Sequence, residues 1–406
     1  MQATLKLAFR NIFRNRMRTV LTLGAIVSGV AAIIVSGGFV EDVFVQLRES
    51  TIHSRLGHVQ VVRAGYHELG RRDPSRYLIT DAQPVTDAIR AIPHVKEVMT
   101  RVSFSGLANN GRADLPIIGE GVEPAKEARL GTATTFIAGH GIEDAEPFGA
   151  VVGEGVAQAL KLKVGDFLNF NVSTVEGALN SLEFKVVGIF RTFSKDYDDR
   201  AVRISQAAAQ ELLFSSAIHT VVVELDDTAA TDVAVAAINA RLKGQGFDAK
   251  PWHELADFYN KTVAIYRRQF GALQAIILVM LVLSVSSTVN MVVYERTGEF
   301  GTLLAMGLRG RQVFRLVLLE NVLLGLVGGV LGVVIGVGLA LALSAIGMEM
   351  PPPPGSSAGY IASIRLVPWV LGVAALTGVL SAIAAAILPS RRAARLPVAE
   401  ALRHNI

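Results

Sequence analysis

Two groups of residues have the types and spacing that could do chemistry. Residues 355–359 read Gly-Ser-Ser-Ala-Gly, the G-x-S-x-G pattern of a hydrolase nucleophile. That motif needs a strand before it and a helix after it, whereas four prolines, residues 351–354, precede it here. His53, His58 and His67 could ligate a metal, but no acidic or cysteine residue accompanies them at ligand spacing. We therefore expect neither catalysis nor a metal site from these residues.

A third candidate is the segment Lys195–Arg200, which reads KDYDDR and offers carboxylates to a cation. It lacks the glycine and the distal glutamate of a calcium-binding loop, so we interpret it as a solvated turn. The chain has no cysteine, which excludes disulfides, thiolate metal sites and cysteine nucleophiles. The sequence thus predicts no catalytic residue, no cofactor-binding residue and no metal ligand, and no enzyme activity of this chain itself.

The composition is that of a membrane protein. Hydrophobic residues make up 51% of the 406 residues and charged residues 18%, against about 25% charged in a soluble domain. A bilayer span needs about 20 apolar residues, and four stretches reach that length. The predicted transmembrane helices are residues 19–40, 269–294, 316–348 and 366–390. The first has 22 uncharged residues, more than a cleaved signal core of about 7–15, so we expect it to stay as an anchor.

Orientation follows from the cations, because cytoplasmic loops are rich in lysine and arginine. Basic residues concentrate in residues 1–18, a predicted N-terminal helix, in residues 295–315 and in the C-terminal tail 391–406. We place these three segments and both termini in the cytoplasm. Residues 41–268 and the short loop 349–365 then lie on the other side of the membrane. The outer block 41–268 carries 25 basic and 30 acidic residues, which argues against nucleic-acid binding.

The outer block is predicted to be a mixed α/β domain, so the fold class is four transmembrane α-helices with a large extracytoplasmic α/β domain between helices 1 and 2. Runs of Val, Ile and Phe predict strands at Val59–Val62, Leu115–Ile118, Phe184–Phe190 and Thr220–Leu225. Helices are predicted at Val85–Ile92, Glu154–Leu160 and Thr231–Leu242. A strand-rich lobe within about residues 100–220 is expected as an insertion. We expect Trp252–Arg268 to be a helix that continues into the second span.

Small residues mark the faces on which the membrane helices pack, because lipid gives helices no hydrophobic drive to associate. The first span repeats small residues every fourth position, and the third contains overlapping GxxxG pairs. These residues are Gly24, Ser28, Ala32 and Ser36 in the first span, and Gly325, Gly328, Gly329, Gly332 and Gly336 in the third. Two interpretations remain open: contact between the two chains of a dimer, or packing among the four helices of one chain.

The spans carry almost no ionisable group, which disfavours ion-coupled transport. Only Glu320 lies within one, and we expect it near Arg311 or Arg315 at the interface. Between the second and third spans, Phe300, Leu303, Leu304 and Gly307 fall on one face of a short helix that could lie at the interface or dock into a partner. A phosphate-binding P-loop needs a Gly-Lys pair, and this sequence has none. Any driving energy is therefore expected from another protein.

Several segments carry a family resemblance. ERTGEFGTLLAMGLRGRQV from Glu295, PSRRAARLPVAEALR from Pro389 and LAFRNIFRNRMRTVLTLGAI from Leu7 resemble MacB/FtsX-type, or type VII, ABC transporter permeases. In the outer block, GHVQVV, VVGEGVAQALKLKVGD and FKVVGIFRT are similar to the lipoprotein-releasing LolC/LolE branch. Pro397 stands where the family usually has an acidic residue, so the start of the last short helix differs from the family pattern.

The resemblance implies a multi-pass protein of the bacterial inner membrane with residues 41–268 in the periplasm. It also implies a homo- or heterodimer of permeases on a cytoplasmic ABC ATPase dimer, which would bind ATP and Mg²⁺. The second span would relay ATP-driven motion to the outer domain, to release lipoproteins or other amphiphilic cargo with a periplasmic chaperone or adaptor. Alternatives are a MacB-type exporter of drugs, haem or peptides, and an FtsX-like transmitter that activates a periplasmic enzyme. The implied ATPase contacts are Glu295, Glu299, Phe300, Leu303, Leu304, Met306 and Arg309, supported by Arg391–Arg403.

A first prediction concerns this segment. Replacing both Leu303 and Leu304 with Asp should uncouple ATP hydrolysis from function, because two charges would stand on the apolar face of the short helix. The outer domain should remain folded. The measurements are assembly with the ATPase and activity of the complex. Full assembly and activity in the double variant would contradict the assignment.

Overall fold

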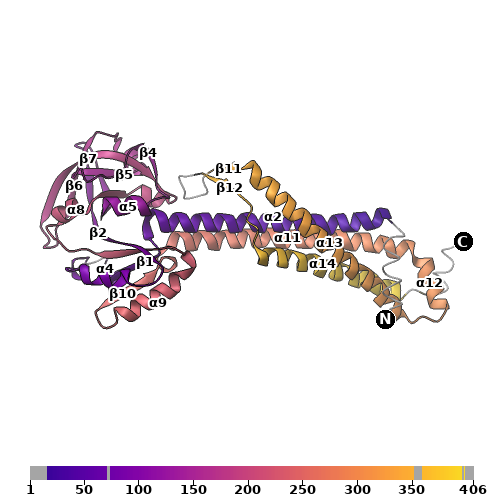
Figure 1. Ribbon diagram of the computed structural model, residues 1–406. Helices are drawn as coiled ribbons and strands as arrows, with labels where there is room; N and C mark the ends of the chain where they lie inside the picture. The colour runs from indigo at the N-terminus through magenta and orange to yellow at the C-terminus, as the bar shows by residue number, and fades with distance from the viewer. Residues whose placement is uncertain (1–15, 71–73, 352–358, 396, 398–406) are drawn as a thin grey trace. The chain divides into compact units, whose positions relative to one another are not determined.

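The computed structural model describes residues 16–70, 74–351, 359–395 and 397 (Figure 1). The chain divides into two compact units. The four-helix unit comprises residues 1–44, 263–349 and 361–406, and the α/β domain comprises residues 45–262 and 350–360. Outside the described residues lie most of the predicted basic N-terminal segment, the serine of the G-x-S-x-G pattern and most of the C-terminal tail.

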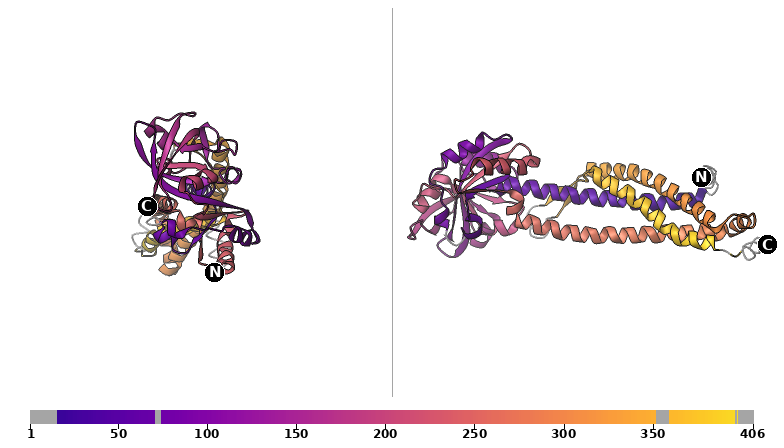
Figure 2. Two further views of the ribbon diagram at one scale, coloured as in Figure 1. Left: turned by 90° about the vertical axis from the view of Figure 1, so that its left-hand side faces the viewer. Right: turned by 90° about the horizontal axis from the view of Figure 1, so that it is seen from below.

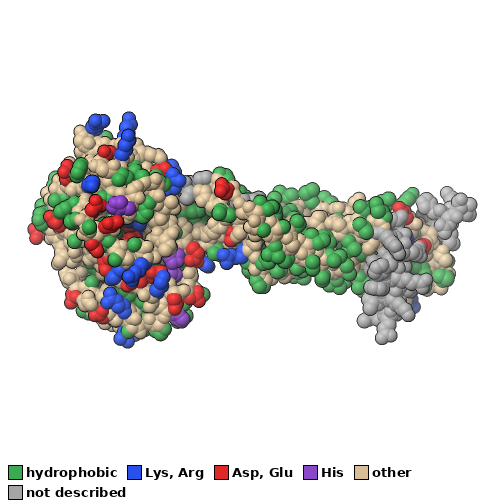
Figure 3. Space-filling model, turned by 45° about the horizontal axis from the view of Figure 1, so that its top comes forward, with side chains coloured by type: hydrophobic (Ala, Val, Ile, Leu, Met, Phe, Trp, Pro, Cys, Tyr) green, Lys and Arg blue, Asp and Glu red, His purple; other side chains and the backbone are tan. Residues whose placement is uncertain are grey.

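Four long apolar helices form the four-helix unit: α2 (Arg16–Thr51), α11 (Asp257–Glu295), α13 (Gly310–Ile346) and α14 (Pro368–Ala394). Each is long and apolar enough to cross a membrane, as the sequence predicts. Hydrophobic side chains cover the face of this unit that Figure 3 shows, as expected where lipid is the solvent. A short helix, α12 (Thr297–Ala305), connects α11 to α13. The helices extend past the predicted spans, and α2 and α11 both continue into the α/β domain.

The α/β domain is built on one ten-stranded sheet, strongly twisted and flanked by short helices (Figure 2). Nine strands follow the order β10-β1-β9-β2-β3-β8-β5-β7-β4, and β6 pairs with β2 and β7. The strands are β1 (Val59–Arg63), β2 (Val95–Asn109), β3 (Asp114–Val122), β4 (Thr135–Gly139), β5 (Gly149–Gly153), β6 (Phe167–Ser173), β7 (Leu179–Arg191), β8 (Ala201–Ser205), β9 (Thr220–Leu225) and β10 (Phe247–Pro251).

Short helices and turns complete the domain. The helices are α3 (Tyr66–Leu69), α4 (Gln83–Arg90), α5 (Pro124–Leu130), α6 (Glu154–Leu160), α7 (Lys195–Asp198), α8 (Gln206–Leu213), α9 (Thr231–Arg241) and α10 (Trp252–Leu255). A π-helical turn covers Ile52–Leu56, and 3₁₀ turns cover Pro74–Tyr77 and Thr228–Ala230. Two small strands, β11 (Met348–Met350) and β12 (Tyr360–Ala362), pair with each other between α13 and α14.

The mixed α/β fold predicted from the sequence is confirmed, including all four predicted strands and the three predicted helices. The sheet order also shows the inserted lobe. β2 is long enough to pair with β9 through Val95–Arg101 and with β3 through Arg101–Asn109. The strands from β3 to β8 therefore extend the sheet on one side, while β1, β9 and β10 complete it on the other.

Two predictions are corrected. The stretch Trp252–Arg268 is not one helix, because α10 ends at Leu255 and Ala256 has a non-helical backbone (φ −90°, ψ 61°) before α11 begins. The segment Lys195–Arg200 is not simply a solvated turn. Its helical turn α7 buries the side chains of Tyr197 and Asp198. The carboxylate of Asp198 is satisfied there by hydrogen bonds from the backbone N–H and the hydroxyl of Thr192.

Two buried histidines make the α/β domain sensitive to acid. His58 accepts a hydrogen bond from the backbone N–H of Leu225 through Nδ1, and His219 accepts one from that of Ser103. Burial lowers the pKa of each histidine to about 4. Their folded pKa values lie below the usual 6.5, so the stability they contribute is complete above pH 6.5 and is lost as the pH falls toward 4.

We expect the free energy of unfolding to fall by about 2 kcal/mol between pH 7 and pH 5. Asp198 opposes part of this loss, since burial raises its pKa to about 6 and its effect favours the acid side. Urea unfolding of the full chain carrying Trp369→Phe, followed by the fluorescence of Trp252, measures the change. His219→Gln keeps an acceptor for Ser103 and should remove most of this net pH dependence, because the opposing effect of Asp198 offsets most of what His58 contributes. An unchanged pH dependence in that variant would contradict the assignment.

Candidate coupling site

The turn around α12 is fixed by backbone and capping hydrogen bonds. α12 ends with Leu308 N–H bonded to the carbonyl of Leu303, a closure that needs the left-handed residue Gly307 (φ 96°). The side chain of Gln312 accepts a hydrogen bond from the backbone N–H of Arg309, at 2.8 Å, and so caps the start of α13. The short helix therefore has a defined position between α11 and α13.

Arg296 is the centre of a buried charge network at the start of α12. Its Nη1 lies 2.8 Å from Oε2 of Glu320 on α13, and its Nε lies 2.9 Å from Oε2 of Glu299 on α12. The guanidinium carbon also lies 5.1 Å from the ring centroid of Phe300. The sequence predicted that Glu320 would lie near Arg311 or Arg315, but the ion pair that the structure shows reaches back to Arg296.

The apolar face of α12 packs on its own chain. Phe300 is fully buried in the core of the four-helix unit, and Leu303 and Leu304 pack partly buried against the same core. In this structure Phe300 therefore has no exposed surface for a partner to contact, and its place among the ATPase contacts stays a prediction. Met306, in contrast, is 67% exposed.

The other predicted contact residues also differ in how far they are exposed. Glu295 and Arg309 are exposed, and Glu299 is half-buried by its bond to Arg296. Of the supporting C-terminal segment, Arg391, Arg392 and Arg395 are described and exposed. The structure thus groups an exposed surface at the end of α12, beside the buried face that the amphipathic pattern emphasised.

The glycines of α13 permit close packing within the chain. Gly328, Gly332 and Gly336 face α2, and Gly325 and Gly329 face α14. A Cβ atom added at Gly332 would lie 2.7 Å from Cβ of Val30, which is closer than carbon atoms approach. These five glycines therefore serve the packing of helices within one chain.

The small-residue face of α2 has a different environment. Gly24, Ser28 and Ala32 are exposed, and no described atom lies within 4 Å of the position of a Cβ on Gly24. Ser36, the fourth member, is half-buried. Among the described residues, the stripe from Gly24 to Ala32 thus faces away from the other three long helices.

Asp42 is a polar contact that the sequence analysis did not identify. Its side chain is buried, accepts a hydrogen bond from the backbone N–H of Ser363 and lies 3.7 Å from Nε of Arg365. The backbone N–H of Arg365 in turn donates to the carbonyl of Gly38 on α2. An acidic residue directly after an apolar span was the available signal. These contacts tie the segment between β12 and α14 to α2.

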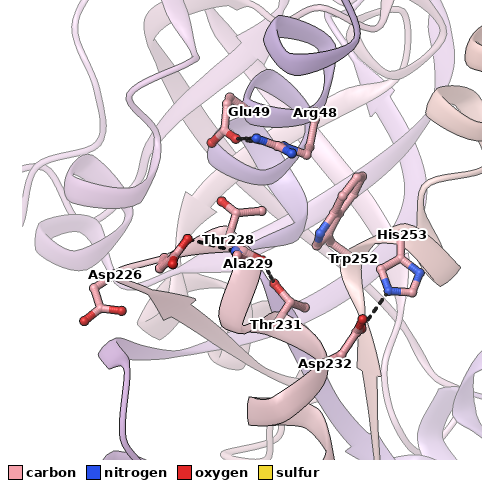
Figure 4. A pocket seen from close by; sticks show the side chains of 10 residues that line it. Arg48, Glu49, Asp226, Thr228, Ala229, Thr231, Asp232, Trp252 and His253 are labelled. Carbon is pink, nitrogen blue, oxygen red and sulfur yellow. Dashed lines mark hydrogen bonds and ion pairs between the residues drawn. The ribbon is translucent and has the colours of Figure 1, made fainter. Parts of the chain in front are cut away.

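A polar pocket of about 490 Å³ lies within the α/β domain, near the end of α2 (Figure 4). Its charged groups are largely paired with one another, including Asp232 with His253 at 3.1 Å and Arg48 with Glu49 at 2.8 Å. Thr228, at its edge, bonds to Nε2 of His58. Because Nδ1 of His58 is an acceptor, Nε2 of the neutral ring carries the proton, and His58 is not placed as a base for Thr228.

Comparisons with known proteins agree with this architecture. Residues 19–241 match the MacB-like periplasmic core domain, and residues 271–398 match the C-terminal domain of FtsX-like permeases. The chain therefore belongs to the MacB/FtsX-type, or type VII, ABC transporter permeases.

Individual relatives span several branches of the family. The chain is 24% identical to an ABC transporter permease of Methanocaldococcus jannaschii, over 98% of this chain and 96% of that one. It is 25% identical to the macrolide export ATP-binding/permease protein MacB of Wolinella succinogenes, over 98% of this chain, and spans 60% of that relative's length. It is 23% identical to the lipoprotein-releasing transmembrane protein LolE of Haemophilus influenzae, over 76% of this chain and 78% of that one.

The different burial of Met306 and Phe300 gives a testable contrast. Met306→Asp should weaken ATPase binding at least tenfold while leaving the thermal unfolding of the permease unchanged, because this side chain is exposed. Phe300→Ala should cost about 3–5 kcal/mol of stability by leaving a cavity. Binding and unfolding of both variants in detergent are the measurements. Normal ATPase binding by Met306→Asp would show that the exposed surface around Met306 is not the contact with the ATPase.

Proposed function

We propose that this chain is the permease subunit of an ABC complex that relays ATP hydrolysis by a separate cytoplasmic ATPase to an α/β domain outside the bacterial inner membrane. The observation that carries the proposal is the continuity of α2 and α11, two helices that each belong to both the four-helix unit and the α/β domain. ATP and Mg²⁺ would be bound by the ATPase. Both termini and α12 would lie in the cytoplasm, where the basic segments concentrate.

The contact with the ATPase would be the exposed surface at the end of α12, with Met306 and Arg309 at its centre. A force applied there would reach α13 through Arg296, which bonds to both Glu299 and Glu320. The tight turn at Gly307 would keep α12 from moving independently of α13. In this scheme Phe300, Leu303 and Leu304 hold the short helix on its own unit, and their role in coupling is indirect.

Two permeases would pair through the first span. The supporting observation is the stripe of Gly24, Ser28 and Ala32, which is left free by the packing of the described helices. Small residues let two helix backbones approach closely in lipid. The partner would be a second copy of this chain or a similar permease.

For the cargo, we propose lipoproteins or other amphiphilic molecules of the outer leaflet. The permease complex would pass them to a periplasmic chaperone or adaptor. The match to LolE and the segments that are similar to the LolC/LolE branch support this choice. A MacB-type exporter of drugs, haem or peptides is the second candidate, favoured by the MacB match over 98% of this chain. An FtsX-like transmitter without cargo would instead keep a periplasmic enzyme bound.

The test is mass spectrometry of the proteins that copurify with the full chain from its own membranes in mild detergent. We expect an ABC ATPase, a second permease and acylated lipoproteins. Met306→Asp is the control, and it should lose the ATPase but retain the permease partner. Copurification of an adaptor and an outer-membrane channel would contradict lipoprotein release and support export. Copurification of a periplasmic hydrolase without cargo would contradict it and support signalling. Absence of an ATPase would overturn the function as a whole.

A further inference from the structure

The end of α2 is held in the α/β domain by side-chain donors of the sheet. After Thr51 the helix changes to the π-helical turn Ile52–Leu56, which closes where the backbone N–H of Gly57 donates to the carbonyl of Ile52. The last carbonyls of a helix lack partners within it and carry partial negative charge. Here the carbonyls of Ser54, Arg55 and Leu56 each accept a hydrogen bond from a side chain of the sheet.

Two of these donors are buried arginines. Arg203 on β8 donates through Nη2 to the carbonyl of Ser54, and Arg101 on β2 donates through Nη1 to the carbonyl of Arg55. Their side chains are only 4% and 3% exposed. Two cations deep in the domain are thus directed at the negative end of one helix.

Two glutamates balance these two charges. Glu127 on α5 bridges the arginines, with its oxygens 2.8 Å from Nη2 of Arg101 and 3.3 Å from Nη1 of Arg203. Glu120 on β3 lies 3.6 Å from Nε of Arg203 and accepts a hydrogen bond from the hydroxyl of Tyr197. Burial alone would raise the pKa of Glu120, but the guanidiniums of Arg101, Arg203 and Arg55 and the hydrogen bond from Tyr197 outweigh it and hold that pKa below its usual range.

The register of the sheet brings the groups together. β3 lies between β2 and β8, and Glu120 pairs directly with Arg203 across the parallel ladder. On the other side Glu120 pairs with Ser103, two residues along β2 from Arg101 and on the same face. The ionic cluster therefore spans three adjacent strands and joins them to the end of α2.

We propose that Arg101 and Arg203, balanced by Glu120 and Glu127, form a clamp that fixes the end of α2 to the sheet, so that the helix and the sheet move as one body. A buried ionic cluster is a poor source of stability, since apolar residues of similar volume often serve as well. What it supplies here is direction, because a planar guanidinium donates along fixed lines to one carbonyl and one carboxylate. The clamp residues are positioning residues, and their importance for transport rests on the proposed function.

The test compares the mobility of the helix end with and without the clamp. The chain has no cysteine, so Ser50→Cys on α2 and Glu183→Cys on β7 give two unique spin-label sites. The clamp-free variant carries Arg101→Met, Arg203→Met, Glu127→Met and Glu120→Gln, which removes equal positive and negative charge and keeps an acceptor for Tyr197. The distribution of label-to-label distances is measured on the full chain in lipid nanodiscs.

We expect a narrow distribution in the otherwise unsubstituted chain and at least a twofold broader one in the clamp-free variant. A matched control replaces both Arg191 and Glu154 with Met, removing an ion pair of the same domain that does not touch α2, and should leave the width unchanged. If the clamp-free variant fails to fold, the double variant Arg101→Lys and Arg203→Lys keeps the charges but loses the planar donors, and should broaden the distribution at least 1.5-fold.

The parent is the chain with only the two cysteine substitutions. A distance distribution as narrow in the clamp-free variant as in the parent would overturn the clamp, and the same holds for the lysine variant if it is the one measured. This measurement needs no ATPase, so it decides the clamp even if the proposed function fails. With the ATPase present and trapped by vanadate, the parent should keep the same label distance as without nucleotide. The clamp-free variant should hydrolyse ATP within about twofold of the parent rate yet show a shifted distance. A nucleotide-dependent shift of equal size in the parent would also contradict the clamp.

Discussion

The close approach of α13 to α2 and α14 is the contact on which the four-helix unit depends. Lipid tails are as apolar as the helix surfaces, so only dense packing favours helix contact over lipid contact. At Gly332 the backbone of α13 lies where any side chain would collide with Val30, and at Gly325 a Cβ would lie 2.9 Å from that of Ala382. This packing fixes α13 against its neighbours, and α13 carries Glu320, the buried partner of Arg296.

Three sets of paired buried charges, among the residues that the structure describes, lie where one element meets another. Arg296 and Glu320 join the start of α12 to α13, and Asp42 with Arg365 joins α2 to the segment between β12 and α14. The cluster around Arg101 joins α2 to the sheet. In each case the cost of desolvation is offset by a partner of opposite sign and by further hydrogen bonds. Apolar packing fills the interior of both units, while the paired charges orient the points at which helices end.

Length and periodicity predicted the four spans and the strands, because lipid and a buried sheet impose simple patterns on a sequence. They did not predict which face of α12 is free. The pattern that includes Phe300 marks an apolar face, and the same pattern results whether that face packs on a partner or on its own chain. The sequence also could not predict the buried ionic cluster at the end of α2, since Arg101 and Arg203 are brought together only by the sheet register. Tyr197 was misinterpreted because its charged neighbours suggested a solvated turn.

The pairing of β1 with β10 has a consequence for biogenesis. Val59 pairs with Pro251, so the sheet cannot be completed until the ribosome has made almost the entire α/β domain. α2 is synthesised long before α13 and α14, and the side chains with which it contacts them, such as Ile26 and Val30, have no intramolecular partner in the interval. Non-local pairing of this kind slows folding and prolongs the exposure of unpaired strands. β1 and the side of α2 that packs on α13 therefore wait longer for their partners than elements that pair with near neighbours in the sequence.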